Sequence, residues 1–138
     1  MKKKKGNRRD GKENGKWVEY HESGTIERQG SYKDSKKEGK WFQYYESGEI
    51  KQEESYKNGK LEGRWVEYYE NGQVYWERSF KDRKQDGKEV MFYKNGQVWL
   101  EANYKAGKSD RWVEYNENGK VEKEGNNIKE WYYEEDID

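Results

Sequence analysis

The sequence contains no cysteine, no proline and a single histidine, His21, among its 138 residues. The absence of cysteine excludes disulfides, thiolate zinc sites and cysteine nucleophiles. One histidine leaves almost no material for a histidine metal cluster or a Ser-His triad. The absence of proline excludes polyproline segments. We therefore expect no metal and no cofactor.

Aliphatic residues are scarce as well. Hydrophobic residues make up 29% of the chain and aromatic residues alone make up 17%. No apolar run approaches the roughly 20 residues of a membrane helix, and a thick aliphatic core is excluded. Low hydrophobicity usually indicates disorder, but disordered chains are poor in aromatics and carry a large net charge. This chain has a net charge of zero, so we expect a fold that rests on aromatic side chains.

The N-terminus does not read as a signal peptide. Lysines at 2–5 are followed by a polar stretch at 6–10, where a signal peptide needs an apolar segment. We therefore expect a cytoplasmic protein, provided that Met1 is the natural start. Residues 1–8 are expected to be a disordered basic tail.

The remaining chain repeats with a period of 23–24 residues. Tryptophans at 17, 41 and 65 are 24 residues apart, and Glu89 and Trp112 continue the series. A turn glycine follows serine or asparagine in every unit, at Gly24, Gly48, Gly72, Gly96 and Gly119. Such periodicity is the signature of a repeat architecture. About five units occupy residues 9–133, beginning with a half unit, and residues 134–138 form an acidic tail.

Each unit is predicted to be a β-hairpin. In the third unit, residues 65–69 and 73–80 are rich in the aromatic and β-branched residues that favour strands. Residues 70–72 suit a type I turn followed by a left-handed glycine, which would pair Tyr68 with Val74. Because each hairpin contacts only its neighbours, the fold class is all-β, an elongated single antiparallel sheet of about five tandem hairpins. Residues 128–133 are expected to close the sheet.

Alternation along the strands assigns the two faces of the sheet. Regular pairing beyond the turn places Val66, Tyr68, Trp76 and Phe80 on one face, together with Tyr32, Tyr56, Leu100 and Tyr104. The other face carries the tryptophan series and glutamates at 19, 67 and 114, with a second row at Glu53, Glu77, Glu101 and Glu124. A two-residue turn would exchange members between the faces.

The unit resembles the MORN repeat, closest to a bacterial variant found in antitoxin-like proteins. Residues 39–48 (GKWFQYYESG) and 63–72 (GRWVEYYENG) carry the motif best. The resemblance implies a protein-binding or scaffolding module, and for bacterial relatives an immunity role. The pattern departs from the family at Glu89 and at Asp110, where the tryptophan and the glycine are lost. Choline-binding wall repeats are an alternative, but only residues 131–133 match their Trp-Tyr-Tyr run.

The charges are segregated although their sum is zero. Lysines flank the turns between units, so one long edge of the sheet should be basic, and glutamates at 22, 46, 70 and 117 make the opposite edge acidic. The simplest interpretation is that these charges keep a thin sheet soluble. An alternative is that the basic edge contacts anionic lipid. That edge is formed by Lys33, Lys57, Lys60, Lys81, Lys84, Lys105 and Lys108.

The tryptophan face is the candidate binding surface. Aromatic rings flanked by carboxylates can stack on and pair with arginine and lysine, so the expected partner is a protein, possibly a toxin, with a basic surface. The simpler alternative is that most aromatics form the core. The candidate residues are Trp41, Tyr45, Trp65, Glu67, Tyr69, Tyr75, Glu77, Tyr93, Trp99 and Glu101.

Other functions fit the sequence less well. Nucleic-acid binding normally requires a strong positive charge, which this chain lacks. Glutamates are repeated in every unit, and repeated positions are usually structural, whereas catalysis needs a unique pocket. His21 replaces a repeated tyrosine and is interpreted as a tolerated substitution. We therefore expect no enzyme activity, and the open terminal strands allow a homodimer.

Overall fold

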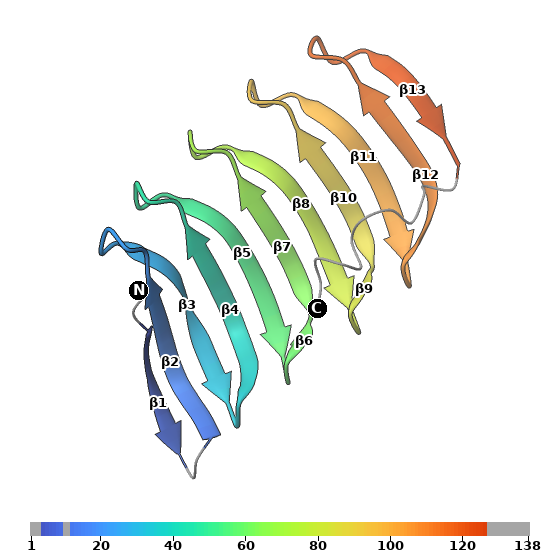
Figure 1. Ribbon diagram of the computed structural model, residues 1–138. Coiled ribbons are helices and arrows are strands. Elements are labelled where there is room, and N and C mark those ends of the chain that lie inside the picture. Colours follow the sequence, from blue (N-terminus) through green and yellow to red (C-terminus); the bar gives the residue numbers. More distant parts are fainter. Residues whose placement is uncertain (1–3, 10–11, 127–138) are drawn as a thin grey trace.

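The computed structural model describes the backbone of residues 4–9 and 12–126 (Figure 1). The described residues form one antiparallel sheet of thirteen strands. The strands lie in chain order, except that the short strands β6 and β9 pair with β5 and β8 at one edge. The strands are β1 (Lys4–Arg9), β2 (Lys12–Tyr20), β3 (Ile26–Lys33), β4 (Lys36–Tyr44), β5 (Ile50–Lys57), β6 (Lys60–Leu61), β7 (Gly63–Tyr68), β8 (Val74–Lys81), β9 (Lys84–Gln85), β10 (Gly87–Phe92), β11 (Val98–Lys105), β12 (Lys108–Tyr115) and β13 (Val121–Gly125).

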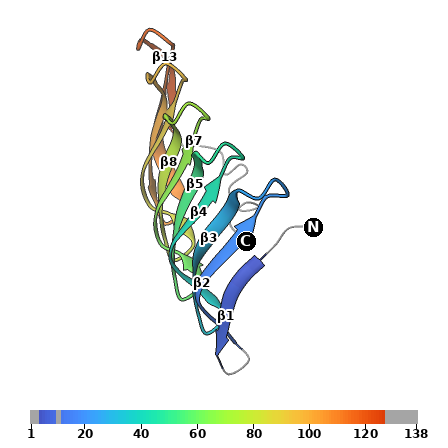
Figure 2. The same ribbon diagram turned by 90° about the vertical axis from the view of Figure 1, so that its left-hand side faces the viewer.

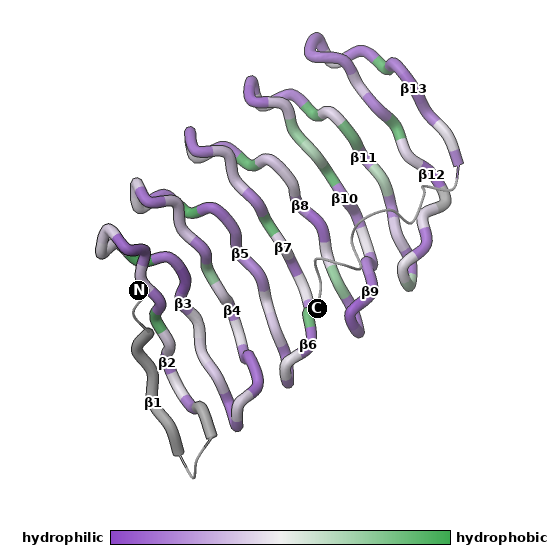
Figure 3. The backbone as a smooth tube through the Cα atoms, viewed as in Figure 1, coloured by the Kyte–Doolittle hydropathy of each residue, from purple (hydrophilic) through white to green (hydrophobic). Residues whose placement is uncertain are grey.

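The predicted fold class is confirmed. Figure 2 shows a thin, arched sheet, and no second layer covers either face within the described residues. Figure 3 shows that both long edges are hydrophilic and that the hydrophobic residues lie between them. The predicted closing strand at 128–133 and the acidic tail at 134–138 lie outside the described residues.

The hairpin turn inside each repeat has the predicted geometry. In the third repeat, the amide of Gly72 donates to the carbonyl of Tyr69, and the amide of Tyr69 donates to the carbonyl of Gln73. Gly72 has a φ of 89°, which glycine adopts without steric cost. We call the edge that carries these turns the hairpin edge.

The turns between repeats are two-residue turns in which both residues have positive φ, as in type I′ hairpins. We call their edge the connecting edge. The residues at these turns are Asp34 and Ser35, Asn58 and Gly59, Asp82 and Arg83, and Ala106 and Gly107. A lysine pair flanks each turn, with Lys57 opposite Lys60 in β5 and β6, for example.

The predicted assignment of the faces is partly wrong because each repeat contains a β-bulge. Tyr68 pairs with Val74 as expected, but Glu67 pairs with Trp76, so Tyr75 is an extra residue in β8. The same shift occurs in the other four hairpins, at Glu27, Lys51, Trp99 and Glu122. A bulge moves every later side chain of its strand to the other face.

The bulge gathers the large aromatics on one face. Trp65, Trp76 and Phe80 lie on the same face, together with Tyr32, Tyr56, Leu100 and Tyr104. We call it the aromatic face. The row Glu53, Glu77, Glu101 and Glu124 moves to the opposite face, which also carries Val18, Phe42, Val66, Val90 and Val113. We call this the valine face.

The core lies on the aromatic face. One cluster contains Trp76, Met91, Leu100, Ala102 and Tyr104, and a second contains Leu61, Trp65 and Phe80. Aromatic rings pack edge to face between neighbouring strands, as Tyr32 does on Trp41 with ring centroids 5.0 Å apart. Large rings therefore supply the burial that scarce aliphatics cannot.

Tyrosine hydroxyls join consecutive repeats along the hairpin edge. The hydroxyls of Tyr45 and Tyr69 donate to the carbonyl oxygens of Tyr68 and Phe92, each at 2.7 Å, and Tyr93 donates to Tyr115 in the same way. His21 takes the first place in this series, with its Nε2 3.0 Å from the carbonyl oxygen of Tyr44. The histidine thus makes the contact that tyrosine makes in the other repeats.

Carboxylate and amide side chains join the repeats along the connecting edge. Glu38 accepts a hydrogen bond from the amide of Asn58 at 2.8 Å, and Glu62 accepts one from the amide of Asp82 at 3.3 Å. Asp86 and Asn14 make the equivalent contacts with Ala106 and Asp34. These bonds satisfy turn amides that the sheet ladder leaves open.

The start of the sheet differs from the prediction. Residues 4–8 were expected to be disordered, but Lys4–Arg9 form β1 and pair with β2, with Arg9 opposite Lys12. The array therefore begins before the predicted half unit at Arg9, with the complete strand β1. This strand satisfies the backbone groups of β2, which would otherwise form an open edge.

Candidate functional site

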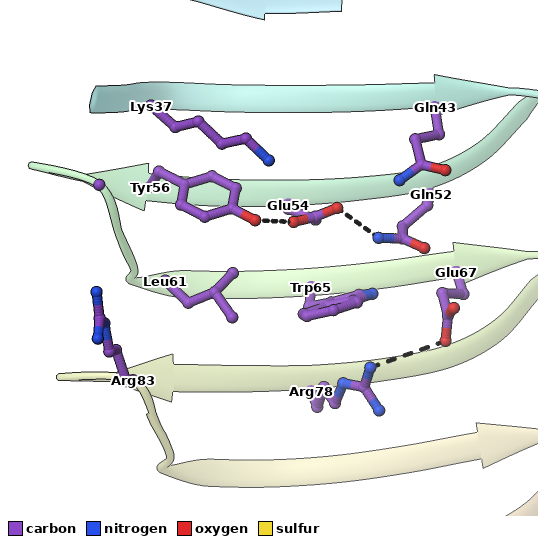
Figure 4. A pocket seen from close by; sticks show the side chains of 11 residues that line it. Lys37, Gln43, Gln52, Glu54, Tyr56, Leu61, Trp65, Glu67, Arg78 and Arg83 are labelled. Carbon is purple, nitrogen blue, oxygen red and sulfur yellow. Dashed lines mark hydrogen bonds and ion pairs between the residues drawn. The ribbon is translucent and has the colours of Figure 1, made fainter. Parts of the chain in front are cut away.

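A polar hollow of about 720 Å³ lies in the aromatic face (Figure 4). It crosses strands β4, β5, β7 and β8, in the central part of the sheet. Three cationic and two carboxylate side chains line it, together with amides and aromatic rings. The lining residues are Lys37, Gln43, Gln52, Glu54, Tyr56, Gly59, Leu61, Trp65, Glu67, Arg78 and Arg83.

Glu54 is a buried carboxylate in the hollow, with 7% of its surface exposed. It accepts one hydrogen bond from Nε2 of Gln52 at 2.5 Å and another from the hydroxyl of Tyr56. Burial raises the pKa of Tyr56, and the charge and hydrogen bond of Glu54 raise it further. Tyr56 therefore stays protonated as a donor, and Glu54 is held by its own strand.

Lys37 places its ammonium group above two aromatic rings. Its Nζ lies 4.9 Å from the ring centroids of both Trp41 and Tyr56, a cation–π geometry. Burial lowers the pKa of Lys37, while the nearby Glu54 opposes this effect. Among the described residues, none forms a hydrogen bond or ion pair with this ammonium, so its three donors are available to a ligand.

Arg78 is a cation in the floor of the hollow, with only 2% of its surface exposed. Its guanidinium lies 3.6 Å from the ring centroid of Trp76 and 4.3 Å from that of Trp65. Its Nη2 lies 4.0 Å from a carboxylate oxygen of Glu67. Ring stacking and this carboxylate compensate for the loss of solvent around the charge.

Glu89 shows why the tryptophan series is interrupted. The residue is fully buried in β10. Its Oε2 accepts a hydrogen bond from Nε1 of Trp76 at 2.8 Å and one from Nε2 of Gln85 at 3.2 Å. A fourth tryptophan would remove the acceptor for Trp76, so the glutamate is a structural replacement in the core.

The predicted binding residues do not share one surface. Trp41 and Trp65 are each only 4% exposed, so they form the core and the floor of the hollow. Glu67 lines the hollow beside Trp65. Glu77 and Glu101 lie on the valine face instead, because of the bulges.

The other predicted aromatics lie towards the hairpin edge. Tyr75 and Trp99, the bulge residues, pack against the core cluster around Trp76. Their rings also contact Tyr69 and Tyr93, with centroids 5.0 Å and 6.1 Å apart. The structure thus brings Trp65 and Glu67 into one site and leaves Tyr45, Tyr69 and Tyr93 as links between repeats.

The predicted basic edge is present. Lys33, Lys57, Lys81 and Lys105 are exposed, and each stands opposite a second exposed lysine across a connecting turn. The spacing of neighbouring strands places successive pairs about 10 Å apart along the edge. These partners are Lys36, Lys60, Lys84 and Lys108.

Several residues of the hollow were missed by sequence reasoning, although the repeat contains a signal for them. The position that faces the tryptophan series in the sheet is Gly30, Glu54, Arg78, Ala102 and Gly125 in successive repeats. The side chain at this position changes at every step, whereas the neighbouring row Glu53, Glu77, Glu101 and Glu124 stays constant. This contrast is the signal in the repeat that singles out Glu54 and Arg78. The missed residues are Lys37, Gln43, Gln52, Glu54, Tyr56, Leu61, Arg78 and Arg83.

No group of three or more histidine, aspartate or glutamate side chains within the described residues could hold a metal ion. In the same part of the chain, no helix is long and apolar enough to cross a membrane.

Comparison with known families identifies the repeats. The model of the MORN repeat variant matches residues 13–34, 37–58, 61–82, 85–106 and 111–130, which is most of the chain. Each match contains one hairpin turn, and repeats of this kind commonly mediate interactions with proteins or membranes. No curated protein matches the chain.

One similar solved structure is the crystal structure of a GtfA/B complex bound to UDP and GlcNAc. The sequences are 8% identical and the TM-score is 0.38. The match covers 91% of this chain and 24% of the other, so this chain spans about a quarter of that protein chain's length.

Proposed function

Because the chain belongs to the family of MORN repeat variants, we propose that it is a non-catalytic module that binds a protein partner through the hollow in its aromatic face. The observation that supports this is the placement of charge. Lys37, Arg78 and Glu54 stand at positions that vary between repeats, and they meet in one hollow in the central part of the sheet. Partner-binding hot spots tend to lie at such central, partly desolvated positions.

Within this proposal, the specific role is that of an antitoxin or immunity protein that acts by occlusion. The sheet presents one continuous, arched face, which can cover a partner's active surface without any chemistry of its own. The expectation of a basic partner surface depended on Glu77 and Glu101 lying beside Trp65. Because both glutamates lie on the valine face, the partner's chemistry must be inferred from the hollow instead.

A bulky substitution in the hollow tests the binding proposal. Gln43→Trp fills the hollow without removing a core ring, and Lys40→Trp places the same bulk on the valine face of the same strand. The partner would be captured by cross-linking in its native cells, identified by mass spectrometry, and measured with purified proteins by calorimetry. We expect Gln43→Trp to abolish binding and Lys40→Trp to preserve it. Equal affinity of the two folded variants would exclude the hollow as the interface.

The antitoxin role needs a separate test. The identified partner should inhibit growth when it is expressed alone, and co-expression of this chain should restore growth. Restoration should fail with Gln43→Trp. A harmless partner would leave a scaffold role in place of neutralisation.

Binding to a membrane surface is a second candidate, supported by the paired lysines of the connecting edge. Basic side chains near an anionic leaflet each contribute about 1 kcal/mol. Flotation with anionic vesicles at low salt tests it, using a variant in which Lys57, Lys60, Lys81 and Lys84 are glutamine as the control. No flotation of the native chain would dismiss this function.

A further inference from the structure

We infer that the hollow recognises an acidic side chain of the partner, held at its connecting end by Lys37 and Arg83. This inference rests on the proposed function and names the partner's chemistry at the same site. The partner is therefore expected to insert a loop or terminal segment that carries aspartate or glutamate.

The cations of the hollow outnumber its carboxylates. Its two carboxylates are already engaged, since Glu54 accepts from Gln52 and Tyr56, and Glu67 faces Arg78. The side chains of Lys37 and Arg83 make no hydrogen bond or ion pair with the rest of the described chain. The hollow thus has three cationic side chains against two carboxylates, and this excess of positive charge favours an acidic group.

The connecting end of the hollow is surrounded mainly by positive charge. Glu38 and Glu62 are bound to the amides of Asn58 and Asp82 in the connecting turns. These two carboxylates and Asp82, which precedes Arg83, are outnumbered by the exposed lysines that flank the connecting turns, among them Lys36, Lys60 and Lys84. An acidic segment approaching from this edge meets mainly positive charge, which favours its encounter and orientation.

Arg83 has a strained backbone conformation. Its φ is 67°, in the left-handed region, where the equivalent residues of two other connecting turns are Gly59 and Gly107. A long side chain in this conformation costs about 1 kcal/mol relative to glycine. Arg83 reaches the hollow from this turn (Figure 4), so the strained position supplies a cation that glycine could not.

The test uses the indole N–H signals of the full-length chain in a nitrogen-15 NMR spectrum. The chain has seven tryptophans, and Trp65→Phe identifies the signal of the residue in the floor of the hollow. A blocked hexaglutamate peptide is titrated, with hexalysine as the comparison. We expect hexaglutamate to shift the Trp65 signal and hexalysine to leave it unchanged.

Two lysines on β4 provide matched variants. Lys37→Gln and Lys40→Gln remove the same charge, but Lys37 lines the hollow and Lys40 pairs with Glu53 on the valine face at 3.2 Å. Lys37→Gln should weaken hexaglutamate binding about tenfold or more, the equivalent of one lost charge-assisted contact. Lys40→Gln should leave it within about twofold, and Lys37→Arg, which keeps the positive charge, should bind hexaglutamate nearly as tightly as the native chain.

Three results would overturn the inference: no shift of Trp65 with hexaglutamate, equal weakening by the two glutamine variants, or a Trp65 shift caused by anionic vesicles and not by the peptide. The proposed function fails separately, when Gln43→Trp does not affect capture of the native partner. If hexaglutamate does not shift the Trp65 signal but Gln43→Trp abolishes capture of the partner, the hollow binds a protein with a different specificity.

Discussion

At the scale of single residues, Gly30 shows that one absent methyl group can decide the packing of the sheet. A Cβ atom at Gly30 would lie 2.1 Å from Cδ2 of Trp41, which is far below any van der Waals contact. Gly125 has the same relation to Trp112, at 2.9 Å. The indole ring of Trp41 occupies the space beside Gly30 because the residue opposite it has no side chain. Neither residue by itself indicates this contact in the sequence.

Gly30→Ala should therefore destabilise the protein by overpacking, by about 3 kcal/mol. The matched control is Gly39→Ala, where a Cβ meets nothing within 4 Å and only the positive φ of 74° is strained, at a cost of about 1 kcal/mol. Urea unfolding followed by circular dichroism measures both. If Gly30→Ala were the milder change, the contact with Trp41 could not be what fixes this glycine.

Arg83 is the residue at which stability and binding should oppose each other. Arg83→Gly relieves the left-handed strain and should raise the free energy of unfolding by about 1 kcal/mol. The same change should weaken hexaglutamate binding, because it removes a cation from the hollow. Ser35→Gly, at the equivalent turn outside the hollow, should stabilise the chain without affecting binding. Loss of stability in Arg83→Gly would show that the arginine serves the fold.

At the scale of the hairpin element, the sequence predicts the strands and the turn but not the bulge. Gly72 and its neighbours indicate the turn because a left-handed residue is needed there. Tyr75 gives no such indication, since bulge residues with ordinary backbone angles need no special side chain. One unrecognised residue per repeat then reverses the faces of Trp76 and Glu77. The fold was therefore predictable, whereas the composition of the binding face was not.

The tyrosines of the hairpin edge should make the protein sensitive to alkali. Burial raises the pKa of Tyr45 and Tyr69 above the ordinary value of 10.0. The unfolded chain then loses these protons first, so stability is complete below about pH 10 and falls as the pH rises further. Burial lowers the pKa of Lys37, which has the opposite effect, but it is one group against several.

Urea midpoints at pH 8 and pH 11, with tyrosinate absorbance at 295 nm, measure this dependence. The midpoint should be lower at pH 11. Tyr69→Phe should lose about 1 kcal/mol at pH 8, because the hydrogen bond to the carbonyl of Phe92 is missing. It should also show a weaker dependence on pH than the native chain. A midpoint that is higher at pH 11 would contradict the role assigned to these hydroxyls.

At the scale of the whole molecule, the sheet behaves as an array of nearest neighbours, but its repeats are not interchangeable. The register of β8 with β10 places Arg78 opposite Glu89, and that of β5 with β7 places Glu54 opposite Trp65. A tryptophan also lies opposite Gly30 in β3 and β4. Each junction on the aromatic face thus has its own pair of facing residues. At some junctions an aromatic ring faces a small or acidic residue, and between β8 and β10 a cation faces an anion.

Removing one repeat of 24 residues at two different places tests this specificity. Deletion of residues 37–60 joins Lys36 to Leu61 and brings Trp65 opposite Gly30, where Trp41 had been. Deletion of residues 61–84 joins Lys60 to Gln85 and brings Glu54 opposite Glu89. Both deletions keep the connecting turns and the hairpins intact. The first deletion should fold and lose only the free energy that one repeat contributes. The second deletion should have a free energy of unfolding about 3 kcal/mol lower than that of the first, because a buried charge loses its partner.

The dependence on pH separates this explanation from a general defect at the new junction. Two buried carboxylates that face each other raise the pKa of one of them above the ordinary value of glutamate, about 4.3. The folded state then binds more protons than the unfolded state, so the stability of the 61–84 deletion should rise as the pH falls from 8 to 5.

Glu54→Gln in that deletion should restore most of the stability at pH 8 and remove the dependence on pH. The same substitution in the native chain should instead destabilise it, because glutamine keeps only one accepting oxygen, and either Tyr56 or Gln52 would then face an NH2 group. Specific pairing predicts that the effect of Glu54→Gln on stability changes sign when the neighbouring repeat changes. Identical repeats could not produce this reversal.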